Sequence, residues 1–139
     1  MDRSELMNIL PHREDMLLLD DAENRDGVSV AHYRVRGDEF FLRGHFPGNP
    51  IVPGVILCEM LAQSACVLMQ GQLLEGRIPV YTGLNHVKFR SPVKPGDTVE
   101  LRSRICRVKH PFYFCEGTVQ VGERLCVSAE FSFAITEVR

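Results

Sequence analysis

Residues 54–70 are apolar on nearly every side of a helix that would run through them. Pro53 stands directly before this stretch and Gly71 directly after it, which are residue types that commonly flank a helix. A helix that is hydrophobic all round has to be covered on all sides by other parts of the protein. The stretch therefore predicts a buried central helix, around which the rest of the chain must fold.

Most of the other periodic segments predict strands. They are rich in Val, Ile, Phe and Tyr and lie at residues 28–35, 80–90, 98–108, 112–121 and 124–135, with turn signals at 92–96, 109–111 and 122–123. A short helix is expected at residues 4–10, with Ser4 as its N-cap and Pro11 as its stop. One buried helix and several consecutive strands predict an α+β fold with an antiparallel sheet packed on the helix.

A single antiparallel sheet covers only one side of such a helix. A second copy of the chain would cover the other side, so the pattern also predicts a homodimer.

Bulk composition excludes several classes of protein. The 139 residues suit one domain spanning 1–139, and the net charge of −2 argues against a nucleic-acid or anionic-membrane binder. No apolar run approaches a membrane span and no secretory signal is evident, so we expect a cytoplasmic protein with no membrane contact. Five cysteines without a C-x-x-C pair favour small buried side chains over a disulfide framework or a zinc site.

The loop before the predicted helix carries one ionisable side chain, His45. Residues 44–54 contain three Gly and three Pro, which make a stiff loop of defined shape around it. At the start of the helix, the N–H of Gly54 has no intrahelical partner and no side chain blocks it, so it could stabilise a carbonyl oxygen that gains negative charge.

Glu59 stands among apolar residues on the same helix, with Gln63 on the same face. A carboxyl group that keeps its proton in such surroundings can act as a general acid. His45 as a base, Glu59 as an acid and the Gly54 N–H as a stabiliser suit proton abstraction next to a carbonyl with loss of a β-hydroxyl.

Three blocks of this sequence resemble the bacterial β-hydroxyacyl-ACP dehydratases, the FabZ family. GHFPGNPIVPGVILCEMLAQ resembles the family signature, in which a catalytic Glu follows the His by fourteen residues, as Glu59 follows His45. LPHREDMLLLD resembles the N-terminal block of the family, and FRSPVKPGD resembles its F-x-x-P-V-x-P-G-D block. The blocks stand in the expected order and span essentially the whole chain.

The resemblance implies a hot-dog fold, in which the sheet wraps a long central helix. It implies dehydration of a 3-hydroxyacyl chain carried on the phosphopantetheine arm of acyl carrier protein, with no metal and no cofactor. It also implies a dimer in which each site takes its His from one subunit and its Glu from the other, and which can assemble as a trimer of dimers, a hexamer.

Carried over by position, His45 resembles the base for the C2 proton and Glu59 the group that assists loss of the C3 hydroxyl. Gly54 resembles the donor to the thioester carbonyl, and Gln63 the residue that orients Glu59. Phe46 and Tyr81 are expected to contact the substrate, Tyr81 at the tunnel mouth. Three basic residues are expected to contact the acidic carrier protein: Lys109, Arg107 and Arg124. A solvated charged sheet edge would account for these basic residues equally well.

Other functions remain open on the sequence alone. Isomerising dehydratases usually carry Asp at the position of Glu59, and hot-dog thioesterases lack the Gly/Pro loop. A non-catalytic or specialised hot-dog subunit that binds acyl thioesters is a further alternative, against which the presence of both His45 and Glu59 argues. Primary fatty acid synthesis and specialised polyketide or polyene pathways use the same chemistry.

Overall fold

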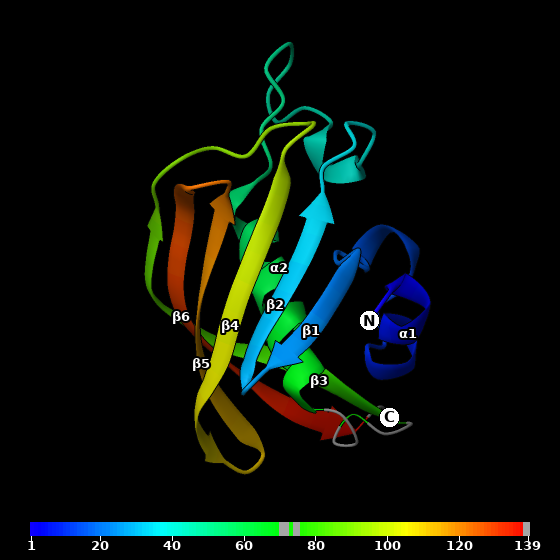
Figure 1. The fold of residues 1–139 in the computed structure, drawn as a ribbon, viewed down its shortest axis with the longest axis vertical. Coiled ribbons are helices and arrows are strands. Elements are labelled where there is room, and N and C mark those ends of the chain that lie inside the picture. The colour runs from blue at the N-terminus through cyan, green and yellow to red at the C-terminus, as the bar shows by residue number, and fades with distance from the viewer. Residues whose placement is uncertain (70–72, 74–75, 138–139) are drawn as a thin grey trace.

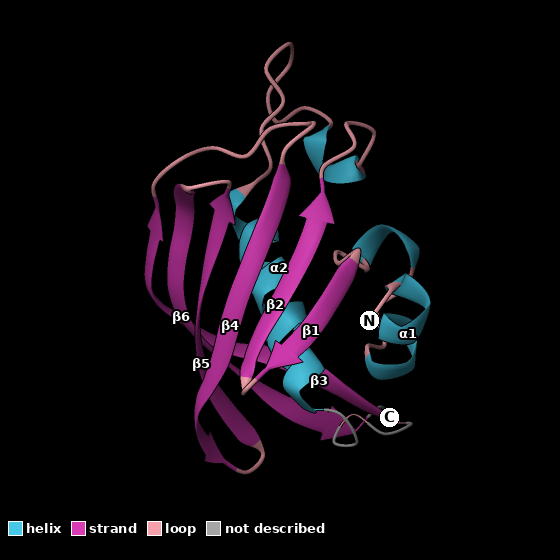
Figure 2. Ribbon diagram, viewed as in Figure 1, coloured by secondary structure: helices cyan, strands magenta, loops and turns pink. Residues whose placement is uncertain are grey.

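One antiparallel sheet of six strands wraps around the helix α2, in a computed structural model that describes residues 1–69, 73 and 76–137 (Figures 1 and 2). The strand order is β1–β2–β4–β5–β6–β3. The strands are β1 (Asp21–Arg25), β2 (Val28–Arg34), β3 (Arg77–Phe89), β4 (Thr98–Lys109), β5 (Phe112–Val121) and β6 (Arg124–Glu137), and the helices are α1 (Arg3–Ile9) and α2 (Gly54–Cys66). The predicted α+β hot-dog architecture is confirmed.

The helix α2 packs tightly on the middle of the sheet. Gly117 of β5 faces it so closely that a Cβ there would lie 2.9 Å from Cδ2 of Leu61. One turn further along α2, the buried hydroxyl of Ser64 lies 2.8 Å from that of Ser103 on β4. Because Leu61 and Ser64 are three residues apart, they share the helix face that the sheet covers.

The N-terminal segment covers another face of the helix. The buried Gln63 side chain accepts a hydrogen bond from the backbone N–H of Leu18 (2.9 Å) and donates one to the carbonyl of Met16 (2.7 Å). Leu17, Leu18 and Leu19 are buried in the same core as α2. The chain's own N-terminal segment therefore covers part of the helix surface that was expected to need a second copy, and the homodimer itself stays a prediction.

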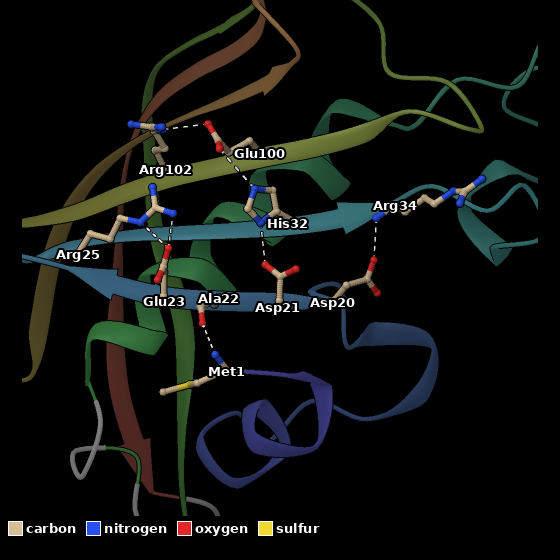
Figure 3. Close-up of polar contacts among 10 residues, drawn as sticks. All are labelled: Met1, Asp20, Asp21, Ala22, Glu23, Arg25, His32, Arg34, Glu100 and Arg102. Carbon is tan, nitrogen blue, oxygen red and sulfur yellow. Dashed lines mark hydrogen bonds and ion pairs between the residues drawn. The ribbon is translucent and has the colours of Figure 1, made fainter.

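The N-terminal elements differ from the prediction in two ways. Helix α1 begins at Arg3, and its N-cap is Asp2, whose side chain accepts from the N–H of Glu5, rather than Ser4. The edge strand β1 was not predicted; only Ala22 is buried in it. Its backbone is anchored by the N-terminal ammonium group, which donates to the carbonyl of Ala22 (2.8 Å; Figure 3).

The C-terminal end of the central helix tightens into a 3-10 turn, Val67–Met69. The predicted end at Gln70 and Gly71 lies outside the described residues. The later strands match their predicted positions to within a few residues, apart from an earlier start of β3 at Arg77.

Four of the cysteines are buried and free, as predicted, whereas Cys106 is exposed on β4. Burial raises the pKa of the Cys115 thiol to about 12, which keeps it in the neutral form. No helix in the described part of the chain is long and apolar enough to cross a bilayer.

Candidate active site

His45 is held by its own loop. Its Nδ1 lies 2.9 Å from the carbonyl oxygen of Ile51, and the N–H of Ile51 donates back to the carbonyl of His45 (2.8 Å). A carbonyl oxygen can only accept, so Nδ1 carries the hydrogen and Nε2 is left as the basic nitrogen. The ring of Phe46 stacks on the imidazole at 4.3 Å between centroids. The loop therefore fixes the orientation of the imidazole and leaves its Nε2 without a hydrogen-bond partner among the described residues.

A cavity of about 410 Å³ joins this histidine to the start of α2. Its lining includes His45, Ile51, Gly54 and Phe89. The N–H groups of Ile56 and Leu57 bond to the carbonyl of Pro53, while those of Gly54 and Val55 have no acceptor within the described residues. His45 and Gly54 thus line one cavity, as the residues of a base and a donor that act on one substrate would have to.

Glu59 lines a different and much smaller cavity of about 40 Å³, together with His12, Gln63 and Tyr81. Its Oε1 lies 3.3 Å from Nε2 of His12 and 3.3 Å from Nε2 of Gln63. The carboxyl group is partly buried, with 24% of the side chain exposed. The predicted contact between Gln63 and Glu59 is present. The shorter hydrogen bonds of Gln63 are those to the backbone of the N-terminal segment.

Tyr81 lines the same small cavity as Glu59, and its expected place at the tunnel mouth stays a prediction. Its hydroxyl donates to the carbonyl of Cys58, and burial, with nearby acidic groups including Glu59, raises the pKa of the phenol far above its usual value. Tyr81 is therefore a neutral wall of the Glu59 cavity. Phe46, in contrast, is 54% exposed next to His45.

The site residues fall into two groups in one chain. Among the residues that the structure describes, none lines both cavities. Gly54 and Glu59 are five residues apart, which places them about 140° apart around the helix axis. Gly54 and Glu59 therefore lie on different sides of the helix. One chain does not bring His45 and Glu59 together in a single cavity.

The three basic residues predicted to meet the carrier protein do not form one cluster. Arg107 and Lys109 belong to the end of β4 that joins β5, whereas Arg124 starts β6 at the other end of the sheet (Figure 1). The guanidinium of Arg107 lies over the ring of Phe114 at 4.3 Å. Arg124 pairs with Asp97 at 3.5 Å, while Lys109 has no acidic partner among the described residues.

His12 is the site residue that sequence reasoning missed. It was noticed only as part of the LPHR block, and nothing local indicates that it meets Glu59. Within the described residues, no group of three or more His, Cys, Asp or Glu side chains is arranged to hold a metal ion.

Comparison with sequences supports a dehydratase family. Residues 21–128 match the family model described as ApeI-like, ApeI dehydratase. A 3-hydroxyacyl-[acyl-carrier-protein] dehydratase FabZ from Caulobacter sp. (strain K31) is 36% identical over 99% of this chain and 87% of the relative. The FabZ protein of Alkaliphilus metalliredigens is 37% identical over 97% of this chain and 94% of the relative.

Comparison with solved structures supports the fold. The dehydratase heterocomplex ApeI:P from Xenorhabdus doucetiae superposes with a TM-score of 0.81 and 19% identity, covering 95% of this chain and 91% of that one. A putative thioesterase from Ralstonia eutropha JMP134 gives a TM-score of 0.63 and 21% identity, covering 82% of this chain and 83% of that one. At these identities the likenesses establish the fold alone, whereas the sequence matches establish that the chain belongs to the family of 3-hydroxyacyl-[acyl-carrier-protein] dehydratases.

Proposed function

We propose that this protein removes water from a (3R)-hydroxyacyl chain on acyl carrier protein to give the trans-2-enoyl thioester. The observation that carries the proposal is that His45, whose Nδ1 is engaged by the carbonyl of Ile51, lines the same cavity as Gly54 at the start of α2. A base beside a donor for the thioester oxygen is the arrangement that removal of a C2 proton requires.

The proposed reaction uses three groups. Nε2 of His45 takes the C2 proton, and the electron pair of that C–H bond forms the C2–C3 double bond. The C3–O bond breaks as Glu59 gives its proton to the departing hydroxyl, which leaves as water. The N–H of Gly54 holds the thioester oxygen while negative charge gathers on it.

The proposal requires two chains, because His45 and Glu59 line separate cavities within one. In a two-fold dimer, His45 of one subunit would meet Glu59 of the partner subunit, and symmetry would create two equal sites. The edge strand β3 supports this, because it leaves Val80, Leu84 and Phe89 more than 40% exposed in the single chain. A trimer of such dimers and a cytoplasmic location stay predictions from the sequence.

Mixing of inactive subunits tests the function and the shared site together. His45→Ala and Glu59→Gln chains are co-expressed with different tags, and enoyl formation from 3-hydroxybutyryl carrier protein is followed. If the two chains pair at random, half of the dimers are mixed, and each mixed dimer has one intact site and one inactive site. About a quarter of wild-type activity should therefore return. No recovery in purified mixed dimers would contradict the shared site, and an inactive wild type on short and long acyl chains would contradict the function.

The sequence leaves a second candidate function open. This is a dehydratase subunit specialised for a polyketide or polyene chain, rather than for primary fatty acid synthesis. Rates on saturated and on already unsaturated 3-hydroxyacyl chains of matched length separate the two, because a specialised enzyme should prefer the unsaturated substrate.

A further inference from the structure

We infer that His12 is a positioning residue that decides which oxygen of Glu59 carries the acid proton. The inference rests on the proposed function, since it gives Glu59 the role of acid. His12 and Gln63 both direct a nitrogen at Oε1, each at 3.3 Å. Within the described part of the chain, no hydrogen bond reaches Oε2.

A protonated carboxyl group has two unlike oxygens: a carbonyl oxygen that accepts, and a hydroxyl that can donate. The hydrogen bond that Gln63 donates to Oε1, and the imidazole of His12 beside the same oxygen, favour that atom as the carbonyl oxygen. The proton then lies on Oε2, where no other protein group competes with the substrate hydroxyl for it. The two contacts on Oε1 therefore favour the protonation pattern that a general acid needs.

The surroundings of His12 make this contact a rigid one. The guanidinium of Arg13 donates to the carbonyls of Met7 (2.9 Å), Leu10 (2.8 Å) and His12 (2.7 Å), which ties the turn to the end of α1. The His12 side chain is only 18% exposed. A fixed turn thus holds the imidazole against the carboxyl group, rather than leaving the contact to a mobile side chain.

The second ring nitrogen of His12 supports a functional reason for the burial. Nδ1 is buried and has no hydrogen-bond partner among the described residues. Burying a polar atom without a partner costs about 1–3 kcal/mol, so a fold gains nothing from an imidazole here for stability alone. An apolar side chain would fill the same place without that penalty, and within the described residues the polar contact of this imidazole is the one from Nε2 to Glu59.

Two substitutions separate the donor from the shape of the side chain. His12→Gln can place an amide N–H near the position of Nε2, whereas His12→Leu removes the donor. We expect His12→Leu to lower kcat about tenfold to a hundredfold with little change in KM, because the acid proton is misplaced but the substrate still binds. His12→Gln should recover most of that loss.

A double-mutant cycle shows whether His12 acts through Glu59. In a Glu59→Gln background, His12→Leu should add no further loss, because the group that it positions is gone. Full kcat in His12→Leu, equal loss in the Leu and Gln variants, or additive losses in the cycle would each overturn the inference. If His12→Leu does not fold, His12→Phe provides a ring without a donor for the same comparison.

The outcomes also separate this inference from the proposed function. A Glu59→Gln variant with full activity would refute the role of Glu59 itself, whatever His12 does. A Glu59→Gln variant that is impaired, beside a fully active His12→Leu, would refute only the positioning role.

Discussion

The ring of Phe89 lies against the α-carbon of Gly54, so that a Cβ added there would come within 2.4 Å of Cε1. Phe89 ends strand β3 and Gly54 begins α2, so this contact closes one wall of the cavity that holds His45. The ring is 58% exposed, which gives it room to move. A side chain at position 54 would therefore displace the ring and cover the N–H that we assign to the thioester oxygen.

Gly54→Ala should accordingly impair activity more than stability. Alanine favours the helix by up to about 1 kcal/mol over glycine, which offsets part of the crowding. We expect kcat/KM to fall about tenfold or more, with the urea midpoint nearly unchanged. Adding Phe89→Ala should restore part of the rate by removing the crowded ring. A Gly54→Ala variant as active as wild type would show that the thioester does not approach this residue.

Removing either acid–base group should reduce the rate by a larger factor. His45→Ala and Glu59→Gln are each expected to lower kcat by about 10²–10⁴-fold, the usual contribution of a positioned proton-transfer group. The enoyl absorbance of the product measures the rate. Glu23→Gln is a control matched to the carboxyl change, because Glu23 is an exposed carboxylate paired with Arg25 on the edge strand β1. Comparable losses in Glu23→Gln would mean that the assay reports general damage.

Carrier recognition can be tested at Lys109, the basic residue without an acidic partner among those described. Lys109→Glu should raise the KM for substrate on acyl carrier protein, because the carrier is acidic and the charge would repel it. The KM for the same acyl group on free pantetheine should not change. Arg25→Glu on the edge strand β1 serves as the charge-matched control. Equal KM values for carrier-bound substrate in both variants would favour the interpretation of Lys109 as a solvated charge.

Stability should depend on pH through His32 on β2 (Figure 3). Burial lowers the pKa of His32, but Asp21 at 2.7 Å and Glu100 at 3.3 Å outweigh it, so the pKa in the folded chain is raised above 6.5. Because the folded protein binds this proton more tightly, the contribution is complete below pH 6.5 and is lost as the pH rises through the raised value. The pair is partly exposed, so the effect should be about 0.2–1 kcal/mol.

Urea unfolding of wild type and His32→Gln measures this contribution. The variant should be less stable than wild type at pH 5.5, and the difference should shrink at pH 8.5. A difference that stays constant across this range would mean that the ion pairs do not contribute through the charge of His32.

The parts of the fold that follow a local pattern were predictable, and those that depend on distant contacts were not. Strands β4, β5 and β6 have clear apolar character and were found almost to the residue, whereas β1 reads DAENR and has a single buried side chain, Ala22. The catalytic candidates His45 and Glu59 were found because they are unusual within their own segments. His12 was missed because its only distinguishing contact is with a residue on another element.

The packing of α2 on the sheet gives the last prediction. A Cβ at Gly117 would lie 2.8 Å from the backbone oxygen of Arg102 and 2.9 Å from Leu61. The backbone oxygen of Arg102 cannot move without disturbing β4, so Gly117→Ala should destabilise the fold by about 1–3 kcal/mol. Gly83→Ala is the milder control, since its Cβ would meet two side-chain atoms, the Ser132 hydroxyl at 3.1 Å and Nδ2 of Asn85 at 3.9 Å. Because α2 also carries Gly54 and Glu59, Gly117→Ala should lower activity although it is remote from both cavities, and equal urea midpoints for the two variants would contradict this tight packing.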